Sequence, residues 1–512
     1  MKITLKKKKY LLFLFIIISL ISISFSSADD KKNFNKENVI YRDAYKFYLN
    51  NISLIIQNNG SIHNNYSIWP PGGGNLNGKM FLYSGGFFLS GYTNGVLWAN
   101  GVASALRISD YEKGTYKFGT NDPRNSIYIL ESSKGDFNSQ WDDWKHAVEL
   151  GANYYDGNKD GRYDPVDLNK NGKWDINEDR PDLLGDATAW CVYKDSKSPN
   201  LRIFNDVEPQ GIEIRQSVFG YASKGVVGNM VFIRYSILNT GMVADTLNDV
   251  FFGSWADPDI GLDNEAYSDD LVGCDTTLNA GYTYNDGYDN DWGANPPCFI
   301  IDFFQGPIAY FPGKTFVDNN GNGIYDAGDT PLDTAKNFQG QIRGVSKFPG
   351  AMNVGMTSFV HQYDLLSGSP DTKFEIRNQM LGRIRFSEPI DPCTWQYGQI
   401  RGGVNCSQVN PLYLYSGNPV TNIGWINTVP SDQRKMSNTG PFKLVKGQPV
   451  DIVVAYVVGR GTNALNSITV AKQYDIVAQL VFDNNFPSPP APPQVKYSVK
   501  NGIDFIDIDF ST

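Results

Sequence analysis

Three stretches of the chain place oxygen-bearing side chains at the same spacing. Each has Asp at its first position, Asn at its third, Asp or Asn at its fifth, Gly at its sixth and Asp at its ninth. Two stretches follow each other within residues 154–182, and the third covers residues 318–329. A hard divalent cation takes about six to eight oxygen ligands, which a wrapping loop can supply from alternate positions. The spacing therefore indicates calcium chemistry.

The same spacing defines the EF-hand or dockerin type of calcium loop, in which positions 1, 3, 5, 7, 9 and 12 supply the ligands and Gly at position 6 allows a sharp turn. Position 7 contributes its backbone carbonyl. The predicted ligands are Asp156, Asn158, Asp160, the Arg162 carbonyl, Asp164 and Asp167 in the first loop; Asp167, Asn169, Asn171, the Lys173 carbonyl, Asp175 and Glu178 in the second; and Asp318, Asn320, Asn322, the Ile324 carbonyl, Asp326 and Asp329 in the third.

Asp167 ends the first loop and begins the second, so either it bridges two ions or the two loops share one ion more loosely. We therefore expect two to three structural Ca²⁺ ions. Position 8 is aromatic in all three loops, as Tyr163, Trp174 and Tyr325, and such a ring can tie a loop to the body of the protein. The alternative is a set of polar turns without metal, which would have no reason to repeat Gly and an aromatic residue at matching places.

The expected role of the ions is structural. Long amphipathic helices, which flank the loops of calcium sensors, are missing on both sides. Extracellular modules bind calcium at about 10⁻⁴ to 10⁻³ M, which suits constant occupancy. A further acidic stretch follows no fixed liganding pattern, so another calcium site and a solvated acidic loop are both open there. Its carboxylates are Asp257, Asp259, Asp263, Asp269, Asp270 and Asp275.

Motifs of known catalytic centres are missing. The three histidines, His63, His146 and His361, form no HExxH motif, and the sequence has no GxSxG and no phosphate-binding GxxxxGK[ST]. The sequence therefore identifies no catalytic residues and favours a protein that is not an enzyme. A glycosidase needs only two carboxylates at a set separation, so the 54 acidic residues leave that alternative open.

The N-terminus has the layout of a secretory signal peptide. Five lysines within residues 2–9 precede an apolar run, residues 10–25, and small residues follow at 26–28. The run is shorter than the roughly 20 residues of a membrane span, so we expect cleavage after residue 28, a secreted or cell-surface protein, and no membrane span after cleavage. Cleavage changes the formal net charge from −9 to −14, which argues against a nucleic-acid partner.

The elements that must position the loops are mainly strands. Short apolar runs alternate with Gly- and Asn-rich turns, and the composition is rich in Tyr and Phe. We predict a mainly β, multi-domain β-sandwich architecture with two short helices, at residues 139–151 and 467–482, and with strands around residues 374–381 and 382–386. Five cysteines in an exported chain favour disulfides, and proximity favours Cys274–Cys298 and Cys393–Cys406 with Cys191 free. Five reduced thiols are the alternative.

The expected organisation has five parts. They are the signal peptide, 1–28; an N-terminal β-rich domain with the tandem loops, 29–200; one or more β-sandwich domains with the third loop and the C-terminal helix, 201–486; a Pro-rich linker, 487–494; and the start of a further β-module, 495–512. The last segment alternates like a hairpin around Asn501-Gly502 and cannot bury a core alone. We therefore expect the natural protein to continue beyond Thr512; the alternative is that this hairpin docks back on the body.

The chain resembles a family of long, uncharacterised bacterial proteins that are exported by the type IX secretion route. The motifs that carry this resemblance are "DGNKDGRYDPVD", "EPQGIEIRQSVFGYA", "NMVFIRYSILNTG", "FFGSWADPDIG", "DDLVGCDTTLNAGYTYN" and "FFQGP". It covers roughly residues 70–310 well and the rest loosely. The resemblance implies a cell-surface or released protein with fibronectin-type-III-like modules, and residues 489–510 look like the start of one. It assigns no activity.

Together these observations predict a secreted, calcium-stabilised protein with a structural or adhesive role. Its surface ligand, a glycan or a protein, is not identified by the sequence. The alternative is a secreted hydrolase or a carbohydrate-binding component acting on extracellular polysaccharide, since the 10 Trp and 29 Tyr could build a sugar-stacking platform.

Overall fold

The computed structural model describes residues 2–6, 42–63, 72–102, 108–363, 368–487, 496–501 and 505–511. The chain divides into two units, residues 1–39 with 489–512, and residues 40–488. In the first unit, β1 (Lys2–Lys6), β32 (Phe505–Ser511) and β31 (Lys496–Asn501) form an antiparallel sheet. Apart from β1, the predicted signal peptide lies outside the described residues, as does nearly all of the predicted linker.

The second unit is built on two large antiparallel sheets. The nine-stranded sheet has the order β10 (Tyr128–Glu131), β13 (Ala187–Lys194), β14 (Ile212–Gly220), β15 (Met230–Asn239), β30 (Val450–Gly459), β19 (Cys298–Gln305), β18 (Ala280–Tyr284), β17 (Leu271–Asp275), with β9 (Glu112–Lys113) beside β13. The ten-stranded sheet has the order β26 (Ser358–Gln362), β29 (Arg434–Val445), β16 (Thr246–Asp257), β7 (Ser84–Thr93), β4 (Ile62–His63), β3 (Ile52–Gln57), β5 (Gly74–Leu76), β6 (Lys79–Leu82). In addition, β2 (Ala44–Tyr48) pairs with β3, and β8 (Val96–Gly101) pairs with β7.

The nine-stranded sheet is buried on both faces. Along β30, Ile452, Val454 and Tyr456 belong to the apolar core that the two sheets share, whereas Val453 and Ala455 belong to a second apolar cluster on the opposite face. Successive side chains of a strand point to opposite faces, which explains why β30 is apolar at every step rather than at every second one. The mainly β, sandwich-like architecture predicted from the sequence is confirmed.

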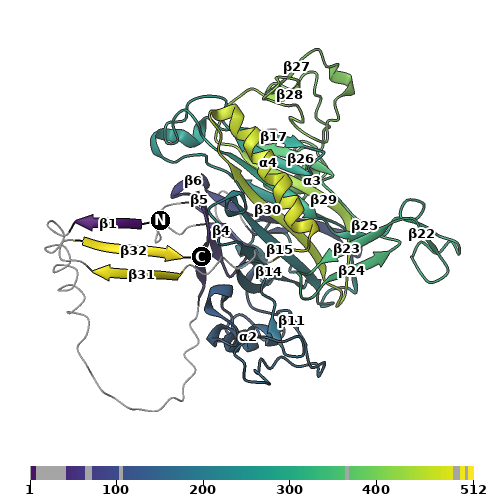
Figure 1. Cartoon of the computed structure of the whole chain (residues 1–512). Coiled ribbons are helices and arrows are strands. Elements are labelled where there is room, and N and C mark those ends of the chain that lie inside the picture. The colour runs from purple at the N-terminus through teal and green to yellow at the C-terminus, as the bar shows by residue number, and fades with distance from the viewer. Residues whose placement is uncertain are drawn as a thin grey trace. The chain divides into compact units, whose positions relative to one another are not determined.

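Three α-helices occur among the described residues, and two of them were predicted. The long helix α4 (Ala464–Asp483) packs on β30 and β19 and covers the second apolar cluster (Figure 1). The helix α2 (Ser139–Glu149) packs on β10, with Trp141 and Trp144 buried. None of the described helices is long and apolar enough to cross a membrane.

The third helix, α3 (Lys373–Met380), lies where we expected a strand at residues 374–381. Thr372 caps its first turn by accepting from the Glu375 backbone N–H, and the T-x-x-E sequence is a capping signal that the apolar alternation had masked. The strand expected at residues 382–386 is likewise wrong, because that segment is a turn with one isolated bridge between Arg383 and Pro389.

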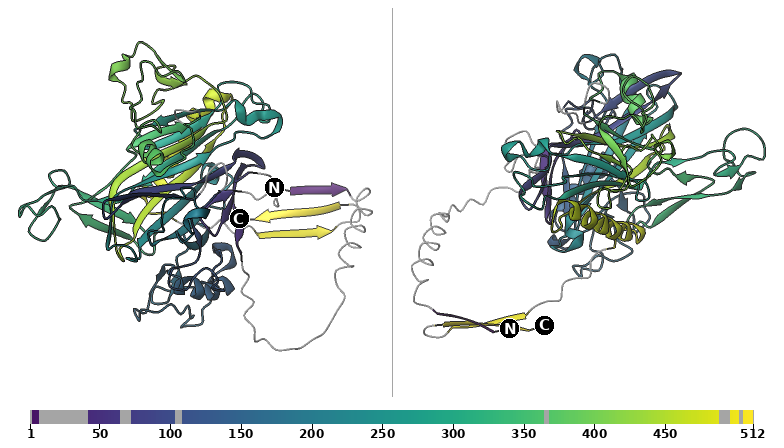
Figure 2. Two further views of the ribbon diagram at one scale, coloured as in Figure 1. Left: turned by 180° about the vertical axis from the view of Figure 1, so that it is seen from behind. Right: turned by 90° about the horizontal axis from the view of Figure 1, so that it is seen from above.

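Short two-stranded ladders carry the loops that leave the sandwich. They are β11 (Tyr154–Tyr155) with β12 (Arg180–Pro181), β20 (Ile308–Ala309) with β25 (Met352–Asn353), β21 (Phe316–Val317) with β22 (Thr330–Pro331), β23 (Thr334–Phe338) with β24 (Val345–Pro349), and β27 (Gly398–Arg401) with β28 (Gly424–Asn427). Short 3₁₀ helices lie at Ser132–Lys134, Pro199–Leu201, Val226–Asn229, Asp263–Ser268 and Cys406–Gln408. The arm that contains β22 extends well away from the sheets in every view (Figure 2).

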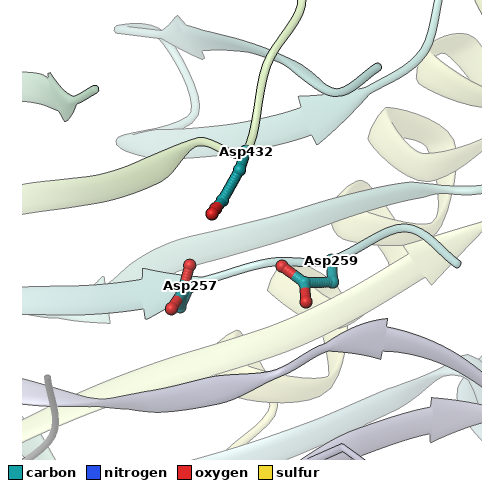
Figure 3. Close-up of side chains that lie close together, drawn as sticks. All are labelled: Asp257, Asp259 and Asp432. Carbon is teal, nitrogen blue, oxygen red and sulfur yellow. The ribbon is translucent and has the colours of Figure 1, made fainter. Parts of the chain in front are cut away.

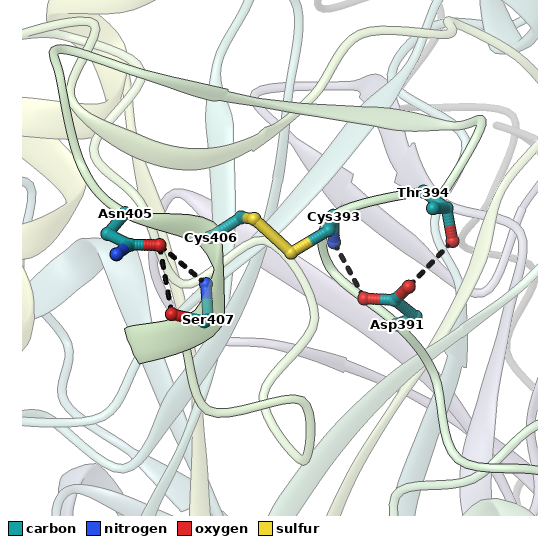
Figure 4. The surroundings of a disulfide bond; sticks show 6 residues. All are labelled: Asp391, Cys393, Thr394, Asn405, Cys406 and Ser407. Carbon is teal, nitrogen blue, oxygen red and sulfur yellow. Dashed lines mark hydrogen bonds between the residues drawn. A yellow bond between two sulfur atoms is a disulfide. The ribbon is translucent and has the colours of Figure 1, made fainter.

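One disulfide prediction is confirmed and the other is wrong. Cys393 and Cys406 are bonded, with their Cα atoms 5.1 Å apart, in a loop where Asp391 accepts from the Cys393 N–H (Figure 4). Cys274 and Cys298 are free and buried. Cys274 lies on β17 and Cys298 on β19, with β18 between them, so two strand spacings of about 4.8 Å exceed the roughly 7 Å limit for a disulfide. Cys191 is free, as expected.

The position expected to separate two domains, near residue 200, lies inside the second unit. β13 and β14 flank it, and they pair along their length from Ala187 with Gly220 to Lys194 with Glu213. Strands from both sides of residue 200 also belong to the ten-stranded sheet, where β7 pairs with β16.

Candidate metal centres

The tandem loops leave and re-enter the protein through the β11–β12 ladder, in which Tyr154 pairs with Pro181 and Tyr155 with Arg180. The paired residues are 25 or more positions apart in the sequence. Their pairing brings the start of the first loop next to the end of the second loop. The third loop is enclosed in the same way by β21 and β22, where Val317 pairs with Thr330. The sequence thus folds each loop region as the tip of a short antiparallel ladder.

The second loop has a closed hydrogen-bond pattern. The Asp167 carboxylate accepts from the backbone N–H groups of Asn171 (3.1 Å) and Gly172 (2.7 Å), which fixes the first half of the turn. Glu178 closes the loop: one carboxylate oxygen accepts from the N–H of Leu168 (2.7 Å) and the other from the N–H of Asp175 (2.9 Å). Positions 1 and 12 therefore each use both carboxylate oxygens to hold the loop backbone.

The third loop repeats this pattern. Asp318 accepts from the N–H groups of Asn322 (3.2 Å) and Gly323 (2.7 Å). Asp329 accepts from the N–H groups of Asn319 (2.9 Å) and Asp326 (3.0 Å), which occupy positions 2 and 9. Asp329 thus makes the same two bonds as Glu178, although it is one carbon shorter.

The first loop has the same hydrogen-bond pattern, but its closing carboxylate comes from a residue outside the predicted loop. Asp156 accepts from the N–H groups of Asp160 (3.2 Å) and Gly161 (2.9 Å), as position 1 does in the other loops. The closing bonds, from position 2 and position 9, are accepted by Asp179: from Gly157 at 3.0 Å and from Asp164 at 2.8 Å.

Asp167 takes no part in those closing bonds, since both of its oxygens accept within the second loop. Spacing alone missed Asp179, which lies well outside the 12-residue window that begins at Asp156. The available signal was indirect: a second acid directly follows Glu178, and Pro165 interrupts the first loop before its twelfth position.

Side chains at positions 3, 5 and 9 converge in the second and third loops. The side-chain amides of Asn169 and Asn171 donate to the same oxygen of Asp175, at 2.7 and 3.0 Å. Asn320 and Asn322 donate to one oxygen of Asp326, at 2.7 and 2.9 Å. Three polar side chains of each loop therefore meet at one point.

Hydrogen bonds also affect the pKa of Asp326. Its pKa is lowered by the backbone N–H of Gly328 and by the side-chain amides of Asn320 and Asn322. A carboxylate that holds its charge at the loop centre suits a cation ligand.

The first loop differs at position 9. The Asp164 carboxylate forms an ion pair with Lys145 of α2, at 3.1 Å, and Lys145 also approaches Asp142 at 3.6 Å. The Asn158 amide donates instead to Asp160, at 3.1 Å. Of the ligands predicted for this loop, Asp156, Asn158 and Asp160 gather at its turn, whereas the Asp164 carboxylate is drawn toward the helix.

The aromatic residues at position 8 fix the loops to the protein as expected. Tyr163 is buried against the α2 tryptophans, and its hydroxyl donates to the Trp141 carbonyl at 3.1 Å. The Trp174 ring N–H donates to the Glu178 carbonyl at 2.8 Å. Tyr325 stacks on Tyr310, with 5.7 Å between the ring centroids.

A separate acidic cluster lies at the ends of two neighbouring strands. Asp257 ends β16, Asp259 follows two residues later, and Asp432 precedes β29. One carboxylate oxygen from each lies within 4.8 Å of the others, and the three side chains gather around a common space (Figure 3). This buried Asp triad could bind a metal ion.

A guanidinium lies beside the triad. Arg434 approaches Asp257 at 3.3 Å and Asp432 at 3.2 Å. Burial, together with the charges of Asp257 and Asp432, raises the pKa of Asp259 well above its usual range, and Arg434 offsets this only in part. Other acids of the same sequence stretch have different contacts: Asp270 accepts from the Ile260 N–H, and Asp275 pairs with Lys472 at 2.8 Å.

No protein-family model matches the chain, and no curated protein sequence matches it.

Proposed function

We propose that this protein is a secreted, calcium-stabilised β-protein of the cell surface or the extracellular space, with a structural or adhesive role. The observation that carries the proposal is the shared closure of the three loops, in which a first-position carboxylate and a closing carboxylate each bind two backbone N–H groups. The signal-peptide layout and the resemblance to type IX-secreted proteins support the location. The proposal includes no catalytic step.

In this proposal each loop holds its own Ca²⁺ ion. Asp167 serves the second loop alone, and Asp179 takes the closing place in the first. The remaining ligands are those predicted from the spacing, with carbonyl oxygens from Arg162, Lys173 and Ile324. These residues offer only oxygen donors, which fits a hard cation.

Calcium would stabilise parts of the protein that have little apolar core. The ligand side chains at the third and fifth positions are exposed, and the exposed Ile176 and Ile324 show that the loop tips bury few apolar groups. An ion that binds only the folded loop stabilises it by RT ln(1 + [L]/Kd), which is about 1.4 kcal/mol for each site at ten times the Kd.

Thermal unfolding of the chain in millimolar calcium and in excess chelator tests this function. We expect the melting temperature to fall by at least a few degrees in chelator and to recover when calcium is restored. Magnesium at the same concentration serves as the control, because it demands a smaller octahedral site and keeps several of its waters. An equal melting temperature in calcium and chelator would contradict a stabilising role.

Adhesion to a surface glycan or protein is the part of the proposal that needs a binding experiment. The carbohydrate-binding alternative would need exposed aromatic faces. A surface groove of about 720 Å³ is lined by Tyr92, Phe251 and Phe374, but the Arg377 guanidinium covers the first two rings, at 5.5 and 4.5 Å from their centroids. That groove therefore gives the alternative no specific support.

A further inference from the structure

We propose that Asp257, Asp259 and Asp432 form a divalent-cation site of their own, distinct from the three loops, and that calcium is the ion that best fits it. The site would fasten the end of β16 to the start of β29. It does not depend on the three loops, so either proposal can fail while the other stands.

The Asp259 side chain is the observation that carries this inference. Asp259 is only 9 % exposed, and among the described residues no hydrogen bond or ion pair reaches its carboxylate. Its oxygen points toward those of Asp257 and Asp432 (Figure 3). A buried carboxylate without a hydrogen-bond donor is costly, and proteins resolve this cost by pairing the charge, by binding a metal or by holding a proton.

Charge balance favours a divalent ion. The Arg434 guanidinium contacts Asp257 and Asp432 and leaves Asp259 facing two other carboxylates. Three carboxylates and one guanidinium carry a formal charge of −2, which one divalent cation neutralises. The cluster contains oxygen donors alone, with no His or Cys, and this donor set selects calcium or magnesium over zinc.

The position of the triad gives the ion a structural effect and a route of entry. β16 and β29 are paired up to Ala256 with Lys435, so Asp257 and Asp432 stand just beyond the last paired residues. The Asp432 side chain is 43 % exposed, which leaves one side of the cluster open to solvent and to water ligands. Magnesium would demand near-ideal octahedral geometry, whereas calcium accepts irregular sets of carboxylates and water.

Counting bound calcium in a protein whose loops are disabled tests the triad directly. The full chain carries Asp156→Asn, Asp167→Asn and Asp318→Asn, and bound calcium is measured by mass spectrometry after equilibrium dialysis in millimolar calcium. We expect one ion per chain. Adding Asp259→Asn should remove it, whereas the matched surface change Asp245→Asn, at the other end of β16 and 84 % exposed, should leave it in place. No ion in the loop-disabled protein, or an ion that survives Asp259→Asn, would overturn the proposal.

Thermal unfolding distinguishes a triad that binds a metal ion from a triad that shares a proton. In chelator, Asp259→Asn should raise the melting temperature, because it removes a buried charge. In calcium, the melting temperature of this variant should increase by less than that of the wild-type protein does. If calcium raised the melting temperature of Asp259→Asn as much as that of the wild-type protein, the cluster would hold a proton rather than an ion. If Asp259→Asn does not fold, Asp432→Asn at the exposed side provides the same comparison.

Discussion

Glu178 and Asp179 are consecutive buried carboxylates that close two different loops. Glu178 binds the backbone N–H groups of Leu168 and Asp175, and Asp179 binds those of Gly157 and Asp164. Because the two residues are adjacent, one short segment of the chain closes both loops. The tandem unit therefore has two loops that close separately but share this segment of backbone.

The ligand assignment predicts which substitutions remove which ion. Asp179→Asn should lose one calcium ion per chain and so should Asp167→Asn, and the double variant should lose two, measured by mass spectrometry after equilibrium dialysis. The reason is that each carboxylate belongs to one loop. If Asp167 bridged both loops, Asp167→Asn alone would remove or weaken two ions, and Asp179→Asn would remove none.

Because the tandem loops share the Glu178–Asp179 segment, we expect a change in that segment to affect calcium binding at both loops. Gly157 lies against Glu178 so closely that a Cβ atom there would come within 2.3 Å of the Glu178 carbonyl oxygen. Gly157→Ala should therefore displace the Glu178–Asp179 segment and weaken calcium binding at both loops, as measured by isothermal titration.

The control for this substitution is Gly287→Ala, because no atom lies within 4 Å of a Cβ at that position. Normal calcium affinity at both loops in Gly157→Ala would show that the segment does not couple them.

The Tyr163 hydroxyl should contribute measurable stability. Tyr163→Phe removes the bond to the Trp141 carbonyl and should lower the free energy of unfolding by about 1 kcal/mol, the usual net value of one hydrogen bond. Urea unfolding in saturating calcium measures this change. Tyr288→Phe, at a residue that is 71 % exposed, is the matched control and should have no effect. Equal stability of the two variants would contradict an anchoring role for Tyr163.

A buried acid of α4, Asp475, predicts how stability depends on pH. Burial raises the pKa of Asp475 from its usual value near 3.8 to about 7, and burial together with Asp475 raises the pKa of Asp302 on β19 well above its usual range. The other charged groups near Asp475 are Asp275 on β17, which raises its pKa, and Lys472 on α4, which lowers it.

The folded protein therefore holds protons that the unfolded chain releases, so the free energy of unfolding should fall as pH rises from about 4 to about 7. Above pH 7 the contribution of Asp475 is constant, since both states have released that proton. In Asp475→Asn, the free energy of unfolding should decrease less as pH rises, and the melting temperature at pH 8 should be higher than in the wild-type protein. Both are measured in chelator so that metal binding does not contribute. An unchanged pH profile in this variant would contradict the assignment.

The sequence predicted the parts of the fold that are set by local pattern. The pattern at residues 467–482 correctly indicated the helix that became α4, which Asn463 caps and whose buried stripe includes Ile468, Ala471 and Ala478. The apolar runs of β15 and β30 correctly indicated strands. Loop spacing pointed to Asp156, Asp167 and Asp318, whose carboxylates accept backbone N–H groups within their own loops, because such a turn is itself a local structure.

What the sequence missed depends on contacts between distant residues. Asp179 reaches the first loop only because the β11–β12 ladder folds the tandem unit back on itself. Asp432 joins Asp257 and Asp259 only because β29 pairs with β16, and nothing in the intervening sequence indicates that pairing. Cys274 and Cys298 are close in sequence, but β18 separates their strands.

The most direct test of the account is a crystal structure with calcium, or a lanthanide in its place, located by anomalous scattering. The account predicts three separate peaks at the loops: one between Asp156 and Asp179, one between Asp167 and Glu178, and one between Asp318 and Asp329. A single peak shared at Asp167, or loops without any peak at millimolar calcium, would contradict it.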